Sequence, residues 1–325
     1  MISRRNYLQN LAASALSLSA NSVWSQEDKS PISIVIGAGA SIDFAARLVA
    51  EQLRESLGRP VVVLAKLGAG QRIALGEVKR SLPNGRTLLF STSGPFSIYP
   101  NIYNKLEYDP VTDFTPIAGI SAFDVAIATG PMTGAKDLKQ LIEWTKSKKT
   151  GDVVYGSSPG NGSLSHFVGI SFGMAADLSL THVPYKESGV GTIDLASGRL
   201  PIMITGVNSF IEMHKAGKIR ILAVSGETRT ASIPEVPTLK EAGINLMHTT
   251  TTGIFGPAKM PTELVKKLQD AIAPIHANIG AKERLAGQSM TMWQSSPSQL
   301  AAYLSEERNK FSTLVKSSGY VKEDA

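Results

Sequence analysis

The chain has 325 residues, of which 42% are hydrophobic and 18% charged, with a net charge of +6 and no cysteine. This length suits two α/β lobes rather than one small core, and the lack of cysteine excludes disulfides, thiolate metal sites and cysteine nucleophiles. The basic residues are scattered and aromatic residues make up only 6%, which argues against nucleic-acid binding, whereas a mild positive field favours small anionic ligands.

The first 25 residues have the layout of an export signal. Paired Arg4 and Arg5 precede an apolar stretch over 8–20, which is too short and too rich in serine and alanine to span a bilayer stably. The run SRRNYLQ (3–9) resembles the twin-arginine export motif, and small residues fit cleavage after Ser25. The sequence therefore predicts export to the periplasm. The alternative is an amphipathic first helix of a cytoplasmic protein.

From residue 31 onward, strands and helices alternate. Apolar runs and amphipathic segments predict, in chain order, a strand over 32–38, a helix over 43–58, a strand over 60–67, a helix over 73–82 and a strand over 86–93. This βαβαβ series predicts parallel pairing with right-handed crossovers. Residues 108–130 then form extended apolar segments without a helix, which suits a passage between two lobes.

A second α/β series follows this passage. It predicts helices over 135–148, 164–176, 190–198 and 208–216, which alternate with strands over 152–158, 180–185, 200–206 and 219–226. Residues 253–261 resemble a return crossing, and two amphipathic helices over 262–280 and 296–319 complete the chain. The predicted fold class is α/β, with two Rossmann-like lobes joined by two hinge strands around a cleft. Its parts are a signal (1–25), lobe one (26–122), lobe two (123–248) and a return segment to lobe one (249–325).

Small polar loops recur where a strand is followed by a helix. They lie at 39–41, 68–70, 91–94, 160–163 and 188–189. A helix that starts there exposes unpaired backbone N–H groups at the positive end of its dipole, which suits an anion. Any one such loop has an ordinary turn or capping role, but loops of this kind on both lobes would clamp a small carboxylate. Asp43 is either a stabilising acid at the helix start or a group that orients water or a ligand ammonium.

Enzymatic motifs are weak. The five histidines share no i, i+4 spacing with one another and no acidic cluster, so no metal site is predicted. Ser163 and His166 lack a nucleophile elbow and an acidic partner, and no Walker A sequence occurs. Gly37 and Gly39 begin like a dinucleotide fingerprint, but Ile42 stands at the third glycine position. We therefore expect neither a cofactor nor catalysis, with an NAD-dependent oxidoreductase as the rival hypothesis.

Four motifs in one order resemble a known family. They are LEYDPVTDFTPIAGIS (106–121), VVYGSSPGNGSLSH (153–166), THVPYKESG (181–189) and ETRTASIPEVPTLKEAG (227–243). Together they resemble the Bug-type extracytoplasmic solute receptors of tripartite tricarboxylate transporters, over roughly residues 31 to 320.

The resemblance implies a type II periplasmic-binding fold that closes on a small organic acid, commonly a carboxylate. Loop N–H groups, hydroxyls and ordered water would hold the ligand, and the receptor would be non-catalytic. We expect a monomer that delivers the ligand to a membrane permease, or alternatively presents it to a membrane sensor. The matching ligand-binding positions are Gly39, Ala40, Ser41, Asp43, Ser93, Asn161, Gly162, Ser163, His166, Tyr185, Ser188 and Gly189.

The chain departs from the family pattern at these loops. The first loop lacks the usual prolines. The second keeps Gly68-Ala69-Gly70 but continues with Gln71 and Arg72, and Arg72 is either a partner for a second carboxylate or a solvated surface residue. Thr205 and Gly206 stand where the family commonly has an acid or amide. We therefore expect the identity of the ligand, rather than the fold, to differ from that of relatives.

Overall fold

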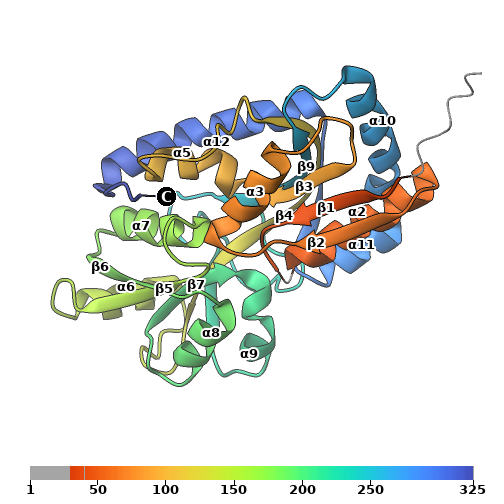
Figure 1. Ribbon diagram of the computed structural model, residues 1–325. Coiled ribbons are helices and arrows are strands. Elements are labelled where there is room, and N and C mark those ends of the chain that lie inside the picture. Colours follow the sequence, from red (N-terminus) through yellow and green to blue (C-terminus); the bar gives the residue numbers. More distant parts are fainter. Residues whose placement is uncertain (1–29, 40, 325) are drawn as a thin grey trace, which may run out of the picture.

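The computed structural model describes residues 30–39 and 41–324 (Figure 1). The export signal predicted for residues 1–25 and the predicted ligand position Ala40 lie outside these residues. Among the described residues, no helix combines the length and the apolar character needed to cross a bilayer.

The first sheet begins with three parallel strands, as the βαβαβ pattern predicts. β1 (Ile32–Ile36) lies between β2 (Val61–Ala65) and β3 (Thr87–Thr92). The ISIVI run of β1 is almost wholly buried because α2 (Ser41–Leu57) and α3 (Arg72–Lys79) take part in the surrounding cores. Helices packed on a parallel sheet explain why the strands read as apolar runs.

One long strand, β4 (Phe114–Thr129), belongs to the sheets of both lobes. Over residues 114–124 it pairs antiparallel with β9 (Thr249–Pro257). From Val125 onward its partners are β7 (Ile202–Gly206) and β8 (Arg220–Val224). The extended passage predicted from the sequence is therefore a continuous strand that changes partners between Asp124 and Val125.

The second sheet continues from β4 through β7 to β5 (Val153–Ser157) and β6 (Leu180–Pro184), with β8 on the other side of β4. Its helices are α6 (Leu138–Lys146), α7 (Leu164–Ala176), α8 (Ser188–Ala196) and α9 (Ile211–Lys215). The molecule is therefore a mixed α/β protein of two lobes, as predicted.

The return segment differs from the sequence expectation in two ways. The single helix expected over 262–280 is α10 (Thr262–Ile272), a 3₁₀ turn (Ala273–His276) and the start of α11 (Ile279–Ala286). Pro274 lies in that turn, and a proline lacks the N–H that would continue the α-helix. The unpredicted strand β10 (Met290–Ser295) pairs with β4 before α12 (Pro297–Ser318).

Three shorter helical pieces also refine the expectation. α4 (Gly94–Ser97) and α5 (Tyr99–Ile102) follow β3, where no helix was predicted. The helix expected over 208–216 is a 3₁₀ turn (Val207–Ser209) followed by α9. These short pieces carry side chains that connect the two lobes, as described below.

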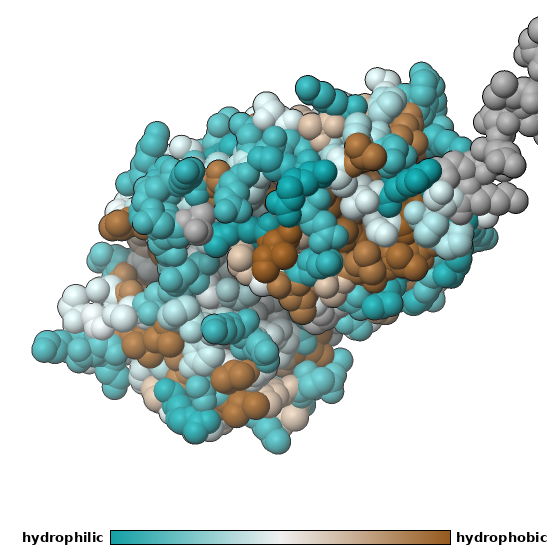
Figure 2. Space-filling view, viewed as in Figure 1, coloured by the Kyte–Doolittle hydropathy of each residue, from teal (hydrophilic) through white to brown (hydrophobic). Residues whose placement is uncertain are grey.

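An apolar cluster joins the lobes beside α7 (Figure 1). Phe167 of α7 packs edge-on against Phe311 of α12, with 5.8 Å between the ring centroids, and also contacts Tyr320. Ile98 and Ile102 complete the contact from the α4 and α5 side of lobe one. On the outer surface, Figure 2 shows apolar side chains gathered near the sheet edge formed by β2, which exposes Val62 and Leu64.

Candidate functional site

In lobe one, the loops that follow β1, β2 and β3 meet through the side chain of Gln71. Its Nε2 donates to Thr92 Oγ1 at 2.7 Å, and its Oε1 accepts from Ser91 Oγ at 3.0 Å. Gln71 has a left-handed backbone (φ 74°) and is buried. A Cβ on Gly37 would lie 2.6 Å from the Gln71 Cα, so only glycine lets these loops approach. Gln71 is thus a fixed part of the site that sequence reasoning noted only as a departure.

The start of α2 carries three of the predicted ligand positions. Gly39 is exposed, and a Cβ there would meet no atom within 4 Å. Ser41 is the first residue of the helix and is half-buried. Asp43 accepts from Arg47 Nε at 2.8 Å and from Nη2 at 3.1 Å. The Asp43 carboxylate therefore has a cationic partner and lies in the first turn of the helix, where the dipole favours an acid.

Ser93 is tied to the return strand β9. Its N–H donates to the Thr251 carbonyl at 2.9 Å, and its buried hydroxyl accepts from the Thr251 N–H at 3.4 Å. The third loop of lobe one is thereby held against the strand that runs back from lobe two.

The second loop of lobe one ends at Arg72, which the structure places against an aromatic ring. The guanidinium carbon lies 4.4 Å from the centre of the Tyr103 ring, a cation–π distance. Its Nη1 is buried and has no hydrogen-bond partner among the described residues. Arg72 is therefore partly shielded from solvent, and within residues 30–39 and 41–324 it has no salt-bridge partner.

In lobe two, the loop between β5 and α7 is organised by Ser163. The hydroxyl of Ser163 caps α7 by accepting from the His166 N–H at 3.2 Å, and it donates to the Gly160 carbonyl at 2.7 Å. Gly160 and Gly162 both have positive φ angles. The Ser163 hydroxyl thus shapes the loop, while Asn161 at the loop tip is exposed.

Two stacked imidazoles lie behind this loop. The rings of His166 and His182 are 3.8 Å apart and nearly parallel. His166 Nδ1 accepts from the Gly162 N–H at 3.2 Å, and His182 Nε2 lies 2.7 Å from Ser157 Oγ. Burial lowers the pKa of His166 to about 3, with a further contribution from the charge of His182, and burial lowers the pKa of His182 to about 4. Both imidazoles are therefore neutral at pH 7.

The remaining predicted positions of lobe two lie around β6 and α8. The Tyr185 N–H donates to the Ser157 carbonyl at 2.9 Å, which places Tyr185 beside the Ser163 loop. Its hydroxyl donates to Asp194 Oδ2 at 2.9 Å. Ser188 and Gly189 begin α8, and Gly189 is exposed.

The two lobes meet at the start of α2 through a residue that sequence reasoning missed. Asn208 lies in the 3₁₀ turn after β7, and its Nδ2 donates to Ser41 Oγ at 2.7 Å. A second contact brings Gly162 of lobe two against lobe one, because a Cβ there would lie 2.2 Å from Ile102 Cδ1. The structure therefore brings Ser41 within reach of lobe two, and the Ser163 loop against α5.

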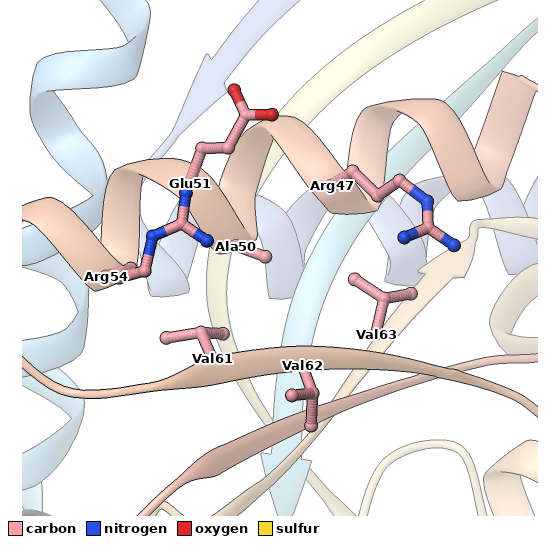
Figure 3. A pocket seen from close by; sticks show the side chains of 7 residues that line it. All are labelled: Arg47, Ala50, Glu51, Arg54, Val61, Val62 and Val63. Atoms are coloured by element: carbon pink, nitrogen blue, oxygen red, sulfur yellow. The ribbon is translucent and has the colours of Figure 1, made fainter.

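Two hollows lie away from these loops. One of about 350 Å³ lies between α2 and β2 and is lined by Arg47, Glu51 and Arg54 of the helix and by valines of the strand. Figure 3 shows Val61 and Val63 pointing toward the helix and Val62 pointing away from it. The other, of about 560 Å³, lies beside α5 and the 103–113 segment. Neither is lined by a predicted ligand residue. Among the described residues, no group of three or more histidine, aspartate or glutamate side chains could hold a metal ion.

Comparison with known proteins identifies the family. The model of the tripartite tricarboxylate transporter family receptor matches residues 45–320. The chain belongs to this receptor family. It is 32% identical over 288 residues to a UPF0065 protein of Bordetella bronchiseptica, an alignment that covers 88% of this chain and 85% of that protein.

Solved structures share the fold of this receptor. Rpa4515 of R. palustris, solved with adipate, is 25% identical with a TM-score of 0.82, over 90% of this chain and 98% of that one. MatC from Rhodopseudomonas palustris, solved with bound malate, is 25% identical with a TM-score of 0.77, over 88% of this chain and 98% of that one. The resemblance inferred from the four motifs and the predicted periplasmic-binding fold are thus confirmed.

Proposed function

We propose that this receptor closes its two lobes on a small organic acid, holds its carboxylate at the start of α2, and delivers it to the membrane permease of a tripartite tricarboxylate transporter. The observation that carries the proposal is the meeting of the lobes at that helix start, where Asn208 lies 2.7 Å from Ser41. Support comes from the structural neighbours solved with adipate and malate.

The electrostatics of the α2 start favour an anion. The first N–H groups of a helix have no partner within the helix, and the helix dipole adds positive potential there. Asp43 would oppose an incoming carboxylate, but Arg47 compensates its charge at 2.8 Å. Gly39 leaves open space beside the helix start. The Ile42 N–H donates to the Gly39 carbonyl at 3.3 Å, so we expect the other N–H groups of the first turn to serve the ligand, beside an Asp43 charge that Arg47 compensates.

The proposal extends to location and organisation. Residues 1–25 direct export to the periplasm by the twin-arginine route and are cleaved near Ser25. Lobe two spans residues 123–248, which is supported by the partner change of β4 after Asp124 and by the start of β9 at Thr249. The receptor acts as a monomer without catalytic activity; membership of a family of transport receptors supports the second of these two expectations.

A thermal-shift screen of the mature chain tests the proposed function. The screen compares the melting temperature of the protein alone with that in the presence of adipate, malate, amino acids, aromatic acids or NAD. A ligand that binds only the folded state stabilises it by about 2.7 kcal/mol at a concentration of 100 times Kd. We expect an upward shift with at least one carboxylate and none with NAD. A shift with NAD alone would favour the oxidoreductase instead.

Calorimetric titration of a Gly39 variant then tests the placement of the ligand. Gly39→Phe projects a ring into the open space beside α2, so we expect at least tenfold weaker binding with an unchanged melting temperature. Gly280→Phe is the control, because Gly280 is also an exposed glycine near a helix start. Equal affinities of the two variants would place the ligand elsewhere. Ser163→Ala examines the lobe-two loop in the same titration, and we expect weaker binding because the loop loses its cap.

A further inference from the structure

The hydrogen bond between Asn208 and Ser41 is a polar contact between the lobes, and it differs in kind from the apolar contact at α7. Phe167, Phe311 and Ile102 are fully or almost fully buried. Asn208, in contrast, is exposed and contributes one hydrogen bond to Ser41, a residue 167 positions away in the sequence. A buried apolar cluster resists separation, whereas one exposed hydrogen bond exchanges readily with water. The Asn208 contact is therefore suited to break and re-form as the lobes move.

The surroundings of Asn208 hold its amide in place. Its neighbours Val207 and Phe210 are buried in the core of lobe two, which anchors the turn. A Cβ on Gly206 would lie 2.9 Å from Asn208 Oδ1, so a side chain at that position would displace the amide. The missing side chain of Gly206 therefore leaves room for the Asn208 amide.

We propose that Asn208 is a positioning residue for ligand binding: by bonding Ser41, it raises the population of the closed arrangement in which both lobes can hold the ligand. It acts through the position of the lobes rather than by contact with the ligand. When the binding-competent state is only partly populated, the apparent Kd is the intrinsic Kd divided by that population. Loss of the contact therefore weakens every ligand by the same factor.

The inference rests on the proposed function for its ligand measurements, but its first test needs no ligand. Small-angle X-ray scattering compares the radius of gyration of the ligand-free wild type, Asn208→Ala and Ser41→Ala. Asn245→Ala is the matched control, because Asn245 is another exposed asparagine of lobe two. We expect both contact variants, and not the control, to be more expanded than the wild type. Equal radii in all four proteins would overturn the proposal.

Titration with adipate and with malate is the second test. For each compound that binds, we expect Asn208→Ala to weaken affinity about 2- to 10-fold, which corresponds to the net contribution of one hydrogen bond. The factor should be equal for the two compounds, and Asn208→Ala combined with Ser41→Ala should bind no more weakly than Ser41→Ala alone, because Ser41→Ala has already removed the contact. Unequal factors would assign Asn208 a direct ligand contact and overturn the positioning role. If neither compound binds, the choice of ligand fails while the scattering result still decides this inference.

Discussion

The stacked histidines of lobe two predict a marked loss of stability between pH 7.5 and pH 5. In the folded chain the pKa of His166 is about 3 and that of His182 about 4, whereas an unfolded histidine has a pKa of about 6.5. At pH 7.5 both states are neutral and the pair imposes no penalty. At pH 5 the unfolded chain binds a proton at each imidazole and the folded chain does not, so unfolding becomes more favourable.

The size of this effect follows from the difference in pKa. A drop of 1.5 pH units below the unfolded pKa, at about 1.4 kcal/mol per unit, gives about 2 kcal/mol for the buried His166. His182 is only half-buried, and solvent screening reduces its share to about 1 kcal/mol. The pair therefore contributes about 3 kcal/mol, a large part of the roughly 5–15 kcal/mol that is typical for a folded protein. This contribution of the neutral histidine pair to the free energy of unfolding is fully present above about pH 6.5 and is lost as the pH falls toward the pKa values of the folded chain.

Urea unfolding of the wild type and of His182→Phe at both pH values measures the contribution. Phenylalanine keeps a flat ring against His166 but binds no proton. We expect the free energy of unfolding to fall by about 1 kcal/mol less in His182→Phe than in the wild type. Another histidine, His248, whose pKa burial lowers to about 4, changes both proteins equally and cancels in the comparison. The same pH dependence in both proteins would refute the neutral state of this imidazole in the folded chain.

Two further changes test how the fold is held. Gly130→Ala should lower the free energy of unfolding by about 2 kcal/mol in urea unfolding, because the new Cβ would lie 1.9 Å from the Leu195 carbonyl oxygen. Gly189→Ala is the control: its new Cβ would meet no atom within 4 Å, so its stability should stay near that of the wild type. Ser296→Ala removes the capping box at the start of α12 and should cost about 1 kcal/mol; an unchanged midpoint would show that the cap is not needed.

The strands and most longer helices could be predicted because their signal is local. The ISIVI run of β1 and the apolar spacing of α2 are set by residues a few positions apart. Strand β10 was missed because its MTMWQS sequence shows no clean alternation, and its pairing with β4 joins distant parts of the chain. The helix break at Pro274 was predictable from local sequence, because a proline inside a helical pattern ends or kinks the helix.

The candidate site was only partly predictable. The loop glycines could be recognised from the sequence, because backbone positions with positive φ angles, such as Gly160 and Gly162, favour glycine. Gln71 joins the loops of lobe one only because its backbone is left-handed. Asn208 reaches Ser41 only because the two lobes, far apart in the sequence, meet in the fold. No local pattern carries that information. The capping role of Ser163 could have been inferred from its place just before an apolar helix.

The partner change along β4 has a mechanical consequence. Strand pairing up to Asp124 belongs to one sheet and pairing from Val125 onward to the other. The second crossing between the lobes reaches β9 at Thr249, which pairs with Asp124. Rotations of a few backbone torsions at both crossings can therefore swing one lobe against the other while the ladder bonds within each sheet stay formed. In the proposed lobe motion, opening costs only the contacts between the lobes, so side chains rather than the backbone set its energy barrier.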